Sequence, residues 1–260
     1  MPPLDAHHDA HHDTRCTPGH GQRWGPYVVG RALGYGHTCQ VYEAHHRDHG
    51  TPFALKLRRT DRTRSGTEAR FRRESGVLAR LQHPHLLRLH ERVADGGWRE
   101  ALVVDLASHG TLRRFLDTHG PVPFGMFDAL GTGLILGLGA CHRAGLHHGQ
   151  IRATKVLVTG PVEAPVAKLT GLGQARDAAF DFWDDPREDI HDLGAVLYEL
   201  VLAGHRDADL PLHLGALDAH PWLPSRHKDA ITACLGPLWR RPRSALGLLA
   251  LWQGHTTVVG

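Results

Sequence analysis

The sequence is poor in cysteine and in net charge. Its four cysteines lie far apart and form no C-x-x-C pair, which argues against a disulfide framework or a zinc knuckle. The formal charge of +3 is small and the cations are spread along the chain, so we expect no nucleic-acid partner. One segment, from Arg58 to Arg73, is rich in arginine. It is either a solvated helix face with its preceding loop or a docking surface for an acidic partner.

Long apolar runs are also missing. Residues 129–141 form the longest one and contain four glycines, whereas a membrane-spanning helix needs about 20 mainly apolar residues. No charged and apolar leader opens the chain. We therefore expect no membrane association and a cytoplasmic location. The hydrophobic content of 41% is sufficient for a substantial core.

Residues 1–24 are rich in His, Asp and Pro and lack apolar periodicity, which predicts a disordered tail. Within it, His7, His8, His11 and His12 form an H-H-x-x-H-H cluster. Neutral imidazoles at this spacing can bind zinc, nickel or copper. The alternative is a tail without a specific metal.

From Tyr27 onward the pattern changes to short strands. We predict strands over 27–33, 40–44 and 53–57, with a glycine turn after the first of them. That turn contains a G-x-G pair, which alone is typical of any tight hairpin. A helix is predicted over 70–81, where the apolar spacing places Glu74 on the side facing the core.

The second half of the chain is predicted to be mainly helical. An apolar strand over 102–107 precedes a helix that begins near Thr111, and a long helix is predicted over 124–143. The long helix holds four glycines, each of which costs up to about 1 kcal/mol relative to alanine. We attribute them to close helix packing.

Taken in order, these segments resemble the protein kinase family, of the bacterial Ser/Thr type. The resemblance covers about residues 25–253 and implies an α+β fold with two lobes. A small β-rich N-lobe with one key helix would span 25–106, and a larger helical C-lobe would span 107–253. Residues 254–260 would form a C-terminal tail.

The resemblance implies an ATP site between the lobes. A glycine hairpin would cover the phosphates, a strand lysine would reach their oxygens, a helix glutamate would hold that lysine, and backbone groups after the last N-lobe strand would meet adenine. The residues that match these roles are Gly34, Gly36, Val41, Ala54, Lys56, Glu74, Asp105, Ala107 and Leu157. Cys39 departs from the pattern because it stands at the third glycine position.

The catalytic loop, residues 148–155, departs further. Gln150 stands where the family has its catalytic aspartate, and Lys155 replaces the metal-binding asparagine. Arg152 retains the positive charge of the family's lysine, which steadies the γ-phosphate. Gly171 stands where the magnesium-binding aspartate is expected. The resemblance thus assigns no catalytic residue in this loop and argues against a bound Mg²⁺ ion. Asp189 remains, placed to accept backbone N–H groups from the loop.

These departures favour a pseudokinase, which would act on a protein partner as a scaffold or allosteric regulator. Lys56, Arg152 and Lys155 would converge where the phosphates sit. The Lys155 ammonium would stand in for the metal and allow ATP to bind without it. Alternatively, Lys155 points to solvent or pairs with Asp177 or Asp181.

Two other functions stay open. One is an active Ser/Thr kinase with a non-standard site, in which Asp181, Asp184 or Asp185 supplies the missing carboxylate; a polar loop is the simpler interpretation of these residues. The other is an interaction module whose cleft is filled by its own side chains.

Overall fold

The computed structural model describes residues 18–36, 38–59, 66–94, 100–177, 185–203 and 214–255. The His-rich cluster of residues 7–12 lies outside this part of the chain, as do Asp181 and Asp184. The side chain of Asp177 also lies outside it.

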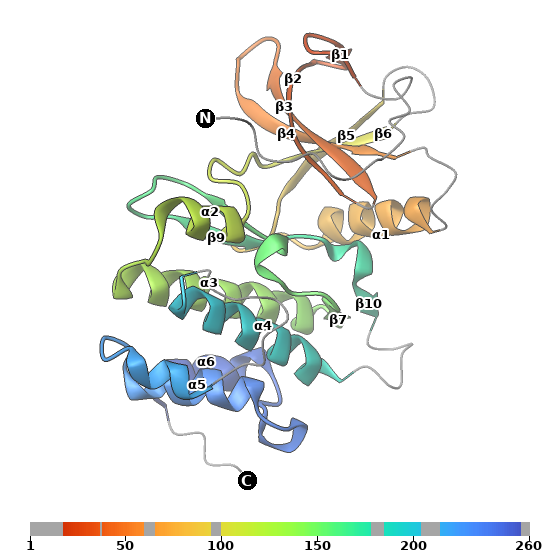
Figure 1. Cartoon of the computed structure of the whole chain (residues 1–260). Coiled ribbons are helices and arrows are strands. Elements are labelled where there is room, and N and C mark those ends of the chain that lie inside the picture. The colour runs from red at the N-terminus through yellow and green to blue at the C-terminus, as the bar shows by residue number, and fades with distance from the viewer. Residues whose placement is uncertain are drawn as a thin grey trace, which may run out of the picture.

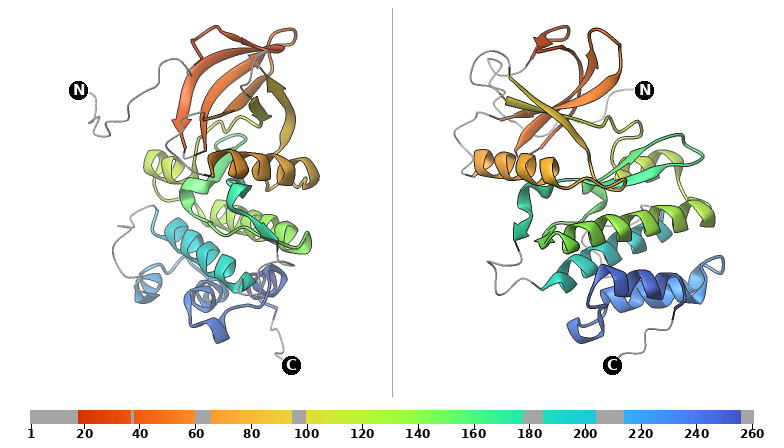
Figure 2. Two further views of the ribbon diagram at one scale, coloured as in Figure 1. Left: turned by 90° about the vertical axis from the view of Figure 1, so that its right-hand side faces the viewer. Right: turned by 180° about the vertical axis from the view of Figure 1, so that it is seen from behind.

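A β-rich lobe formed by the first part of the chain stands on a helical lobe (Figures 1 and 2). The upper lobe is a six-stranded sheet in the order β1-β2-β3-β4-β6-β5, whose paired neighbours are all antiparallel. Its strands are β1 (Arg23–Trp24), β2 (Tyr27–Tyr35), β3 (Cys39–His46), β4 (Pro52–Arg58), β5 (Leu89–Ala94) and β6 (Glu100–Val104). Helix α1 (Thr67–Arg80) lies between this sheet and the lower lobe (Figure 1). The predicted α+β fold with two lobes is confirmed.

The lower lobe is built mainly from helices and also contains two short antiparallel strand pairs. The helices are α2 (Leu112–His119), α3 (Phe124–Arg143), α4 (Pro186–Val201), α5 (Ser225–Leu235) and α6 (Ala245–Trp252). The strand pairs are β7 (Leu146–His147) with β10 (Arg176–Asp177), and β8 (Val156–Thr159) with β9 (Val166–Leu169). Short 3₁₀ turns are η1 (Ala153–Lys155), η2 (Leu172–Gln174), η3 (Leu214–Ala219) and η4 (Leu238–Arg240).

The sheet begins earlier than the sequence pattern indicated. Residues 18–24 contain a turn and strand β1, and the Trp24 side chain is fully buried beside Tyr27 and Tyr42. The predicted disordered tail of residues 1–24 is therefore too long at its C-terminal end. A single buried indole anchors this segment, and one residue produces no periodicity.

The glycines of α3 permit close packing, as predicted. A Cβ added at Gly131 would lie 2.4 Å from the Trp252 ring, and one at Gly137 would lie 2.7 Å from the His85 carbonyl oxygen. Real side-chain atoms do not approach this closely, so only glycine fits.

Helix α3 is also the one helix in the described part of the chain that is long and apolar enough to cross a membrane. Of its most apolar window, 61% is buried inside the protein, as is usual for a core helix.

Candidate nucleotide site

A pocket of about 640 Å³ lies between the two lobes. Its volume is in the range of small-molecule sites. All nine residues predicted to surround ATP line it, namely Gly34, Gly36, Val41, Ala54, Lys56, Glu74, Asp105, Ala107 and Leu157. Strands β2, β3 and β4 form its upper wall, and β8, η1 and the segment before η2 form its lower wall. The cleft is open, so the described residues do not fill it with their own side chains.

Lys56 and Glu74 form a buried ion pair at the inner end of the pocket. Lys56 Nζ lies 2.5 Å from Glu74 Oε1, and the two residues are 8% and 3% exposed. Burial alone would lower the pKa of Lys56, but the adjacent Glu74 carboxylate outweighs it and raises the pKa, so the lysine stays charged. The pairing expected from the resemblance is therefore present.

Strand β6 ends at Val104, earlier than the predicted strand over 102–107, and the chain continues as an irregular connection to α2. The Asp105 side chain accepts hydrogen bonds from His90 (2.8 Å) on β5 and from Lys168 (2.9 Å) on β9. Burial would raise the pKa of Asp105, but these two donors lower it below its usual value. The Asp105 carboxylate is thus engaged in the protein, while its backbone borders the pocket.

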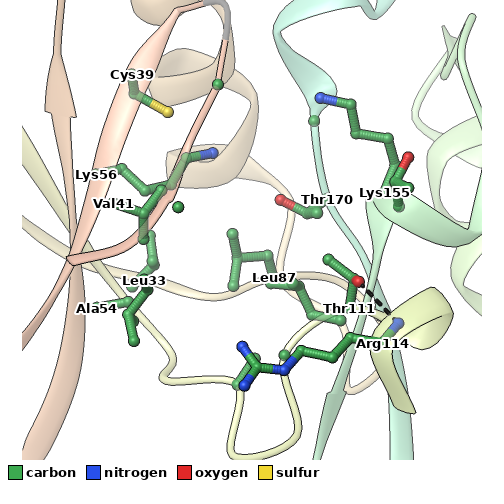
Figure 3. A pocket seen from close by; sticks show the side chains of 18 of the residues that line it. Leu33, Cys39, Val41, Ala54, Lys56, Leu87, Thr111, Arg114, Lys155 and Thr170 are labelled. Atoms are coloured by element: carbon green, nitrogen blue, oxygen red, sulfur yellow. Dashed lines mark hydrogen bonds between the residues drawn. The ribbon is translucent and has the colours of Figure 1, made fainter. Parts of the chain in front are cut away.

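Lys155 occupies the space left by the missing side chain at Gly171. A Cβ added at Gly171 would lie 3.0 Å from Lys155 Cδ and 3.6 Å from Nζ. Figure 3 shows the Lys155 side chain reaching into the pocket from the wall opposite Lys56. Among the described residues no carboxylate pairs with its ammonium. The Lys155 side chain is partly exposed and borders the open pocket. Pairing with Asp177 or Asp181 concerns side chains outside the described part.

Of the two other loop residues, Gln150 and Arg152, only Gln150 lines the pocket. Gln150 lines the pocket, at the position where the family has its catalytic aspartate. Arg152 is exposed and does not line the pocket, so our expectation that it would join the cations there is wrong. Its backbone is extended just before η1. Removing the Arg152 guanidinium from water would cost free energy. Among the described residues, this end of the pocket has no unpaired carboxylate that could offset that cost.

The buried Asp189 carboxylate accepts hydrogen bonds from the backbone of the catalytic loop. Asp189 Oδ2 accepts from the His148 amide (2.7 Å) and the His142 ring (3.0 Å), and Oδ1 accepts from the Gly149 amide (2.8 Å). Burial would raise the pKa of Asp189, but these hydrogen bonds lower it. The predicted role of Asp189 is therefore confirmed.

Magnesium does not fit the residues of this pocket. At the positions where the family has its metal-binding asparagine and aspartate, this chain has the Lys155 ammonium and Gly171, neither of which offers a side-chain oxygen ligand. Asp185 is committed elsewhere, because it caps α4 by accepting from the Arg187 amide (2.9 Å) and pairs with its guanidinium. The described residues contain no cluster of three or more His, Cys, Asp or Glu side chains able to hold a metal.

Cys39 brings a thiol into the pocket where the family has glycine. It is 6% exposed, and burial raises its pKa, although Lys56 and Lys155 act in the opposite direction. The thiol is therefore neutral at physiological pH and acts as a small apolar group.

Sequence reasoning missed three arginines that line the pocket, Arg31, Arg70 and Arg114. Arg70 precedes Glu74 by four residues, so the helical period could have placed it on the same face of α1. Arg114 follows the cap residue Thr111 by three, and no sequence pattern shows that its side chain folds back toward the cleft. The arginine-rich segment 58–73, for which a solvated helix face and a docking surface were both open, makes two contacts within the protein: Arg59 donates to the Gly36 carbonyl (3.3 Å) and Arg73 to the Ala175 carbonyl (3.3 Å).

Comparison with known proteins gives one consistent result. Residues 27–181 match the Protein kinase domain family. The serine/threonine-protein kinase PknL of Mycobacterium tuberculosis is 30% identical over 249 residues, which cover 80% of this chain and 59% of PknL. The serine/threonine-protein kinase pkn2 of Myxococcus xanthus is 28% identical over 222 residues, covering 75% of this chain and 26% of pkn2. This chain thus spans well under two thirds of these relatives.

A solved structure agrees with the fold. The crystal structure of the Mycobacterium tuberculosis PknI kinase domain superposes with a TM-score of 0.69 at 22% identity, covering 92% of this chain and all of that domain. With the sequence matches and the order of the elements, this leads to one conclusion: the chain belongs to the protein kinase family.

Proposed function

We propose that this protein is a pseudokinase that binds a nucleotide without a divalent metal and acts through a protein partner, as a scaffold or allosteric regulator. The observation that carries the proposal is the placement of the Lys155 side chain over Gly171. A cation then stands where the family holds a metal, and the carboxylate that would bind the metal is absent.

The charge of the pocket supports this proposal. Five cationic side chains line it, Arg31, Lys56, Arg70, Arg114 and Lys155, against the two carboxylates Glu74 and Asp105. Both carboxylates are already paired with basic side chains of the protein. The excess positive charge favours an anion of several charges, such as the phosphates of ATP, whose negative charge the metal would otherwise neutralise.

The shape of the pocket also suits a nucleotide. Val41 and Ala54 above and Leu157 below provide apolar walls for a base. The Asp105 amide donates to the Arg88 carbonyl (3.3 Å), and the Ala107 carbonyl accepts from the Gly110 amide (3.1 Å). The Asp105 carbonyl and the Ala107 amide are then the backbone groups we assign to the edge of adenine.

Gln150 supports the loss of phosphoryl transfer. A neutral amide is not a general base at physiological pH, and general-base assistance is worth about 10²–10⁴ in rate. The loss of metal ligands removes a second contribution, since phosphoryl transfer depends mainly on cations at the phosphate oxygens.

The direct test is ATP binding by calorimetry in EDTA and in Mg²⁺. We expect binding in EDTA, a weakening of about tenfold or more in Lys155→Met, and no gain from Mg²⁺. The double variant Lys155→Asn/Gly171→Asp restores the family's ligands, and aspartate tolerates the left-handed backbone of position 171 (φ +86°). In this variant we expect binding to require Mg²⁺. Strict metal dependence in the unmodified protein, or no binding at all, would defeat the metal-free proposal.

An active Ser/Thr protein kinase is the second candidate, favoured by the names of the relatives and by the formed Lys56–Glu74 pair. It predicts transfer of radiolabel from ATP to protein hydroxyls, abolished in Lys56→Ala. Such transfer in the unmodified protein would replace the pseudokinase proposal.

A further inference from the structure

The outer end of the pocket carries a cation that lies apart from the two lysines expected to meet the triphosphate of a nucleotide (Figure 3). Arg114 lies in the first turn of α2, and its guanidinium points into the pocket (Figure 3). The lysines that would meet the 5′-phosphates, Lys56 and Lys155, lie toward the other end. The pocket is therefore positive at both ends and apolar between them.

Local contacts direct Arg114 inward. A Cβ added at Gly110 would lie 3.2 Å from Arg114 Cδ, so the arginine stem packs over a glycine that turns the backbone at φ +73°. The Arg114 amide donates to Thr111 Oγ1 (3.3 Å), which caps the helix and fixes the first turn. A side chain at position 110 would displace the arginine from the pocket.

The guanidinium has no carboxylate partner in the described part of the chain. Of the two carboxylates that line the pocket, Glu74 pairs with Lys56, and Asp105 pairs with His90 and Lys168. The neighbouring Arg113 differs, because it reaches Glu199 at 2.6 Å on the far side of the helix. Arg114 thus offers an unused planar donor fork to a ligand, and this fork matches a phosphate.

A nucleotide in the proposed orientation places its ribose beside Arg114. With the base against Asp105 and Ala107 and the 5′-phosphates at Lys56 and Lys155, the sugar bridges the two ends near the start of α2. An ordinary ribose presents only neutral hydroxyls there. We propose that the pocket selects a nucleotide that carries a second phosphate on its ribose, at the 2′ or 3′ oxygen, and that Arg114 binds this phosphate. This inference rests on the proposed nucleotide site.

The test compares three ligands by calorimetry in EDTA: adenosine 5′-monophosphate, adenosine 2′,5′-bisphosphate and adenosine 3′,5′-bisphosphate. We expect one of the bisphosphates to bind the unmodified protein about tenfold or more tightly than the monophosphate. Which isomer gains affinity identifies the phosphate position. In Arg114→Gln the ratio of the two affinities should fall to about one. Arg80→Gln removes an equally charged exposed side chain on α1 and should leave the ratio unchanged.

The outcomes separate the two proposals. If the monophosphate binds but neither bisphosphate gains affinity, or if the gain persists in Arg114→Gln, the ribose-phosphate inference is wrong and the nucleotide site stands. If none of the three ligands nor ATP binds, both proposals fall. Melting temperatures of the two variants, compared with the unmodified protein, verify that each is folded.

Discussion

The catalytic loop has two sides, and they differ in how much of the kinase pattern they retain. On the side facing the lower lobe, backbone amides of His148 and Gly149 are held by Asp189, as the family resemblance implied. On the side facing the cleft, Gln150 and Lys155 replace an acid and a metal ligand. Backbone hydrogen bonds maintain the loop's shape whatever the cleft-facing side chains are. The loop can therefore keep its backbone conformation when its cleft-facing side chains change.

The largest effect is expected when the Asp189 carboxylate, which holds the loop backbone, is removed. In Asp189→Ala two amides and one imidazole lose their acceptor inside the protein, and each such loss costs about 1–3 kcal/mol. We expect the free energy of unfolding, measured with urea, to fall by about 3 kcal/mol or more. Asp192→Ala removes a single 3.2 Å bond to the Ile151 amide and should cost about 1 kcal/mol. Equal effects of the two variants would contradict a central role for Asp189.

A second substitution tests the helix beneath the loop. Gly137→Ala forces a Cβ against the His85 carbonyl, and overpacking of this kind costs about 1–3 kcal/mol. Gly76→Ala is the matched control, because no atom lies within 4 Å of the added Cβ on α1. It should stabilise the protein by about 0.5–1 kcal/mol. Urea unfolding measures both variants, and a neutral Gly137→Ala would show that the two segments can separate.

The pH dependence of stability should also depend on titratable groups on the side of the loop that faces the lower lobe. Burial lowers the pKa of His148 in the folded protein, so the unfolded chain binds the proton more readily. Stability should then fall as pH drops below about 6.5, the ordinary histidine value. The lowered pKa values of Asp105 and Asp189 add a second loss, which begins below about pH 4 and continues as pH falls through the folded values. In His148→Leu, urea unfolding at pH 5.5 and 7.5 should show a smaller difference between the two pH values.

The cleft-facing side should show the smallest effects on stability. Gln150→Asp and Lys155→Met change partly exposed side chains that have no buried partner among the described residues, and such changes are usually within about 0.5 kcal/mol. Thermal unfolding tests this directly. A large loss in Lys155→Met would mean that its contact with Gly171 is structural, and the comparison between the two sides would then fail.

Much of the fold could be predicted from the sequence, because the spacing of apolar residues marks most of its helices and strands. Helix α3 spans residues 124–143 as predicted, since apolar residues mark its length. The strand predicted over 102–107 begins two residues after the start of β6 and ends three residues after its end, because the apolar Leu106 and Ala107 continue the pattern after the backbone has left the sheet.

The pocket was predicted less completely than the fold. All nine residues predicted to surround ATP line it because they follow the family's order along the chain. The exposure of Arg152 and the inward course of Arg114 were not predicted. The direction of a long charged side chain depends on its neighbours in space, such as Gly110 beneath Arg114, and these contacts leave no periodic trace in the sequence.

The glycine contacts of the helical lobe also constrain how this sequence can diverge. Gly131 faces Trp252, and Gly194 faces the Cβ atom of Cys234 at 2.4 Å from its own ideal Cβ position. Each contact joins segments that are far apart along the chain, so a larger residue on one side requires a smaller one on the other. Related sequences with alanine at the position of Gly131 should carry a residue smaller than tryptophan at position 252. These paired positions should therefore change together, whereas Gly76, which faces open space, should vary independently.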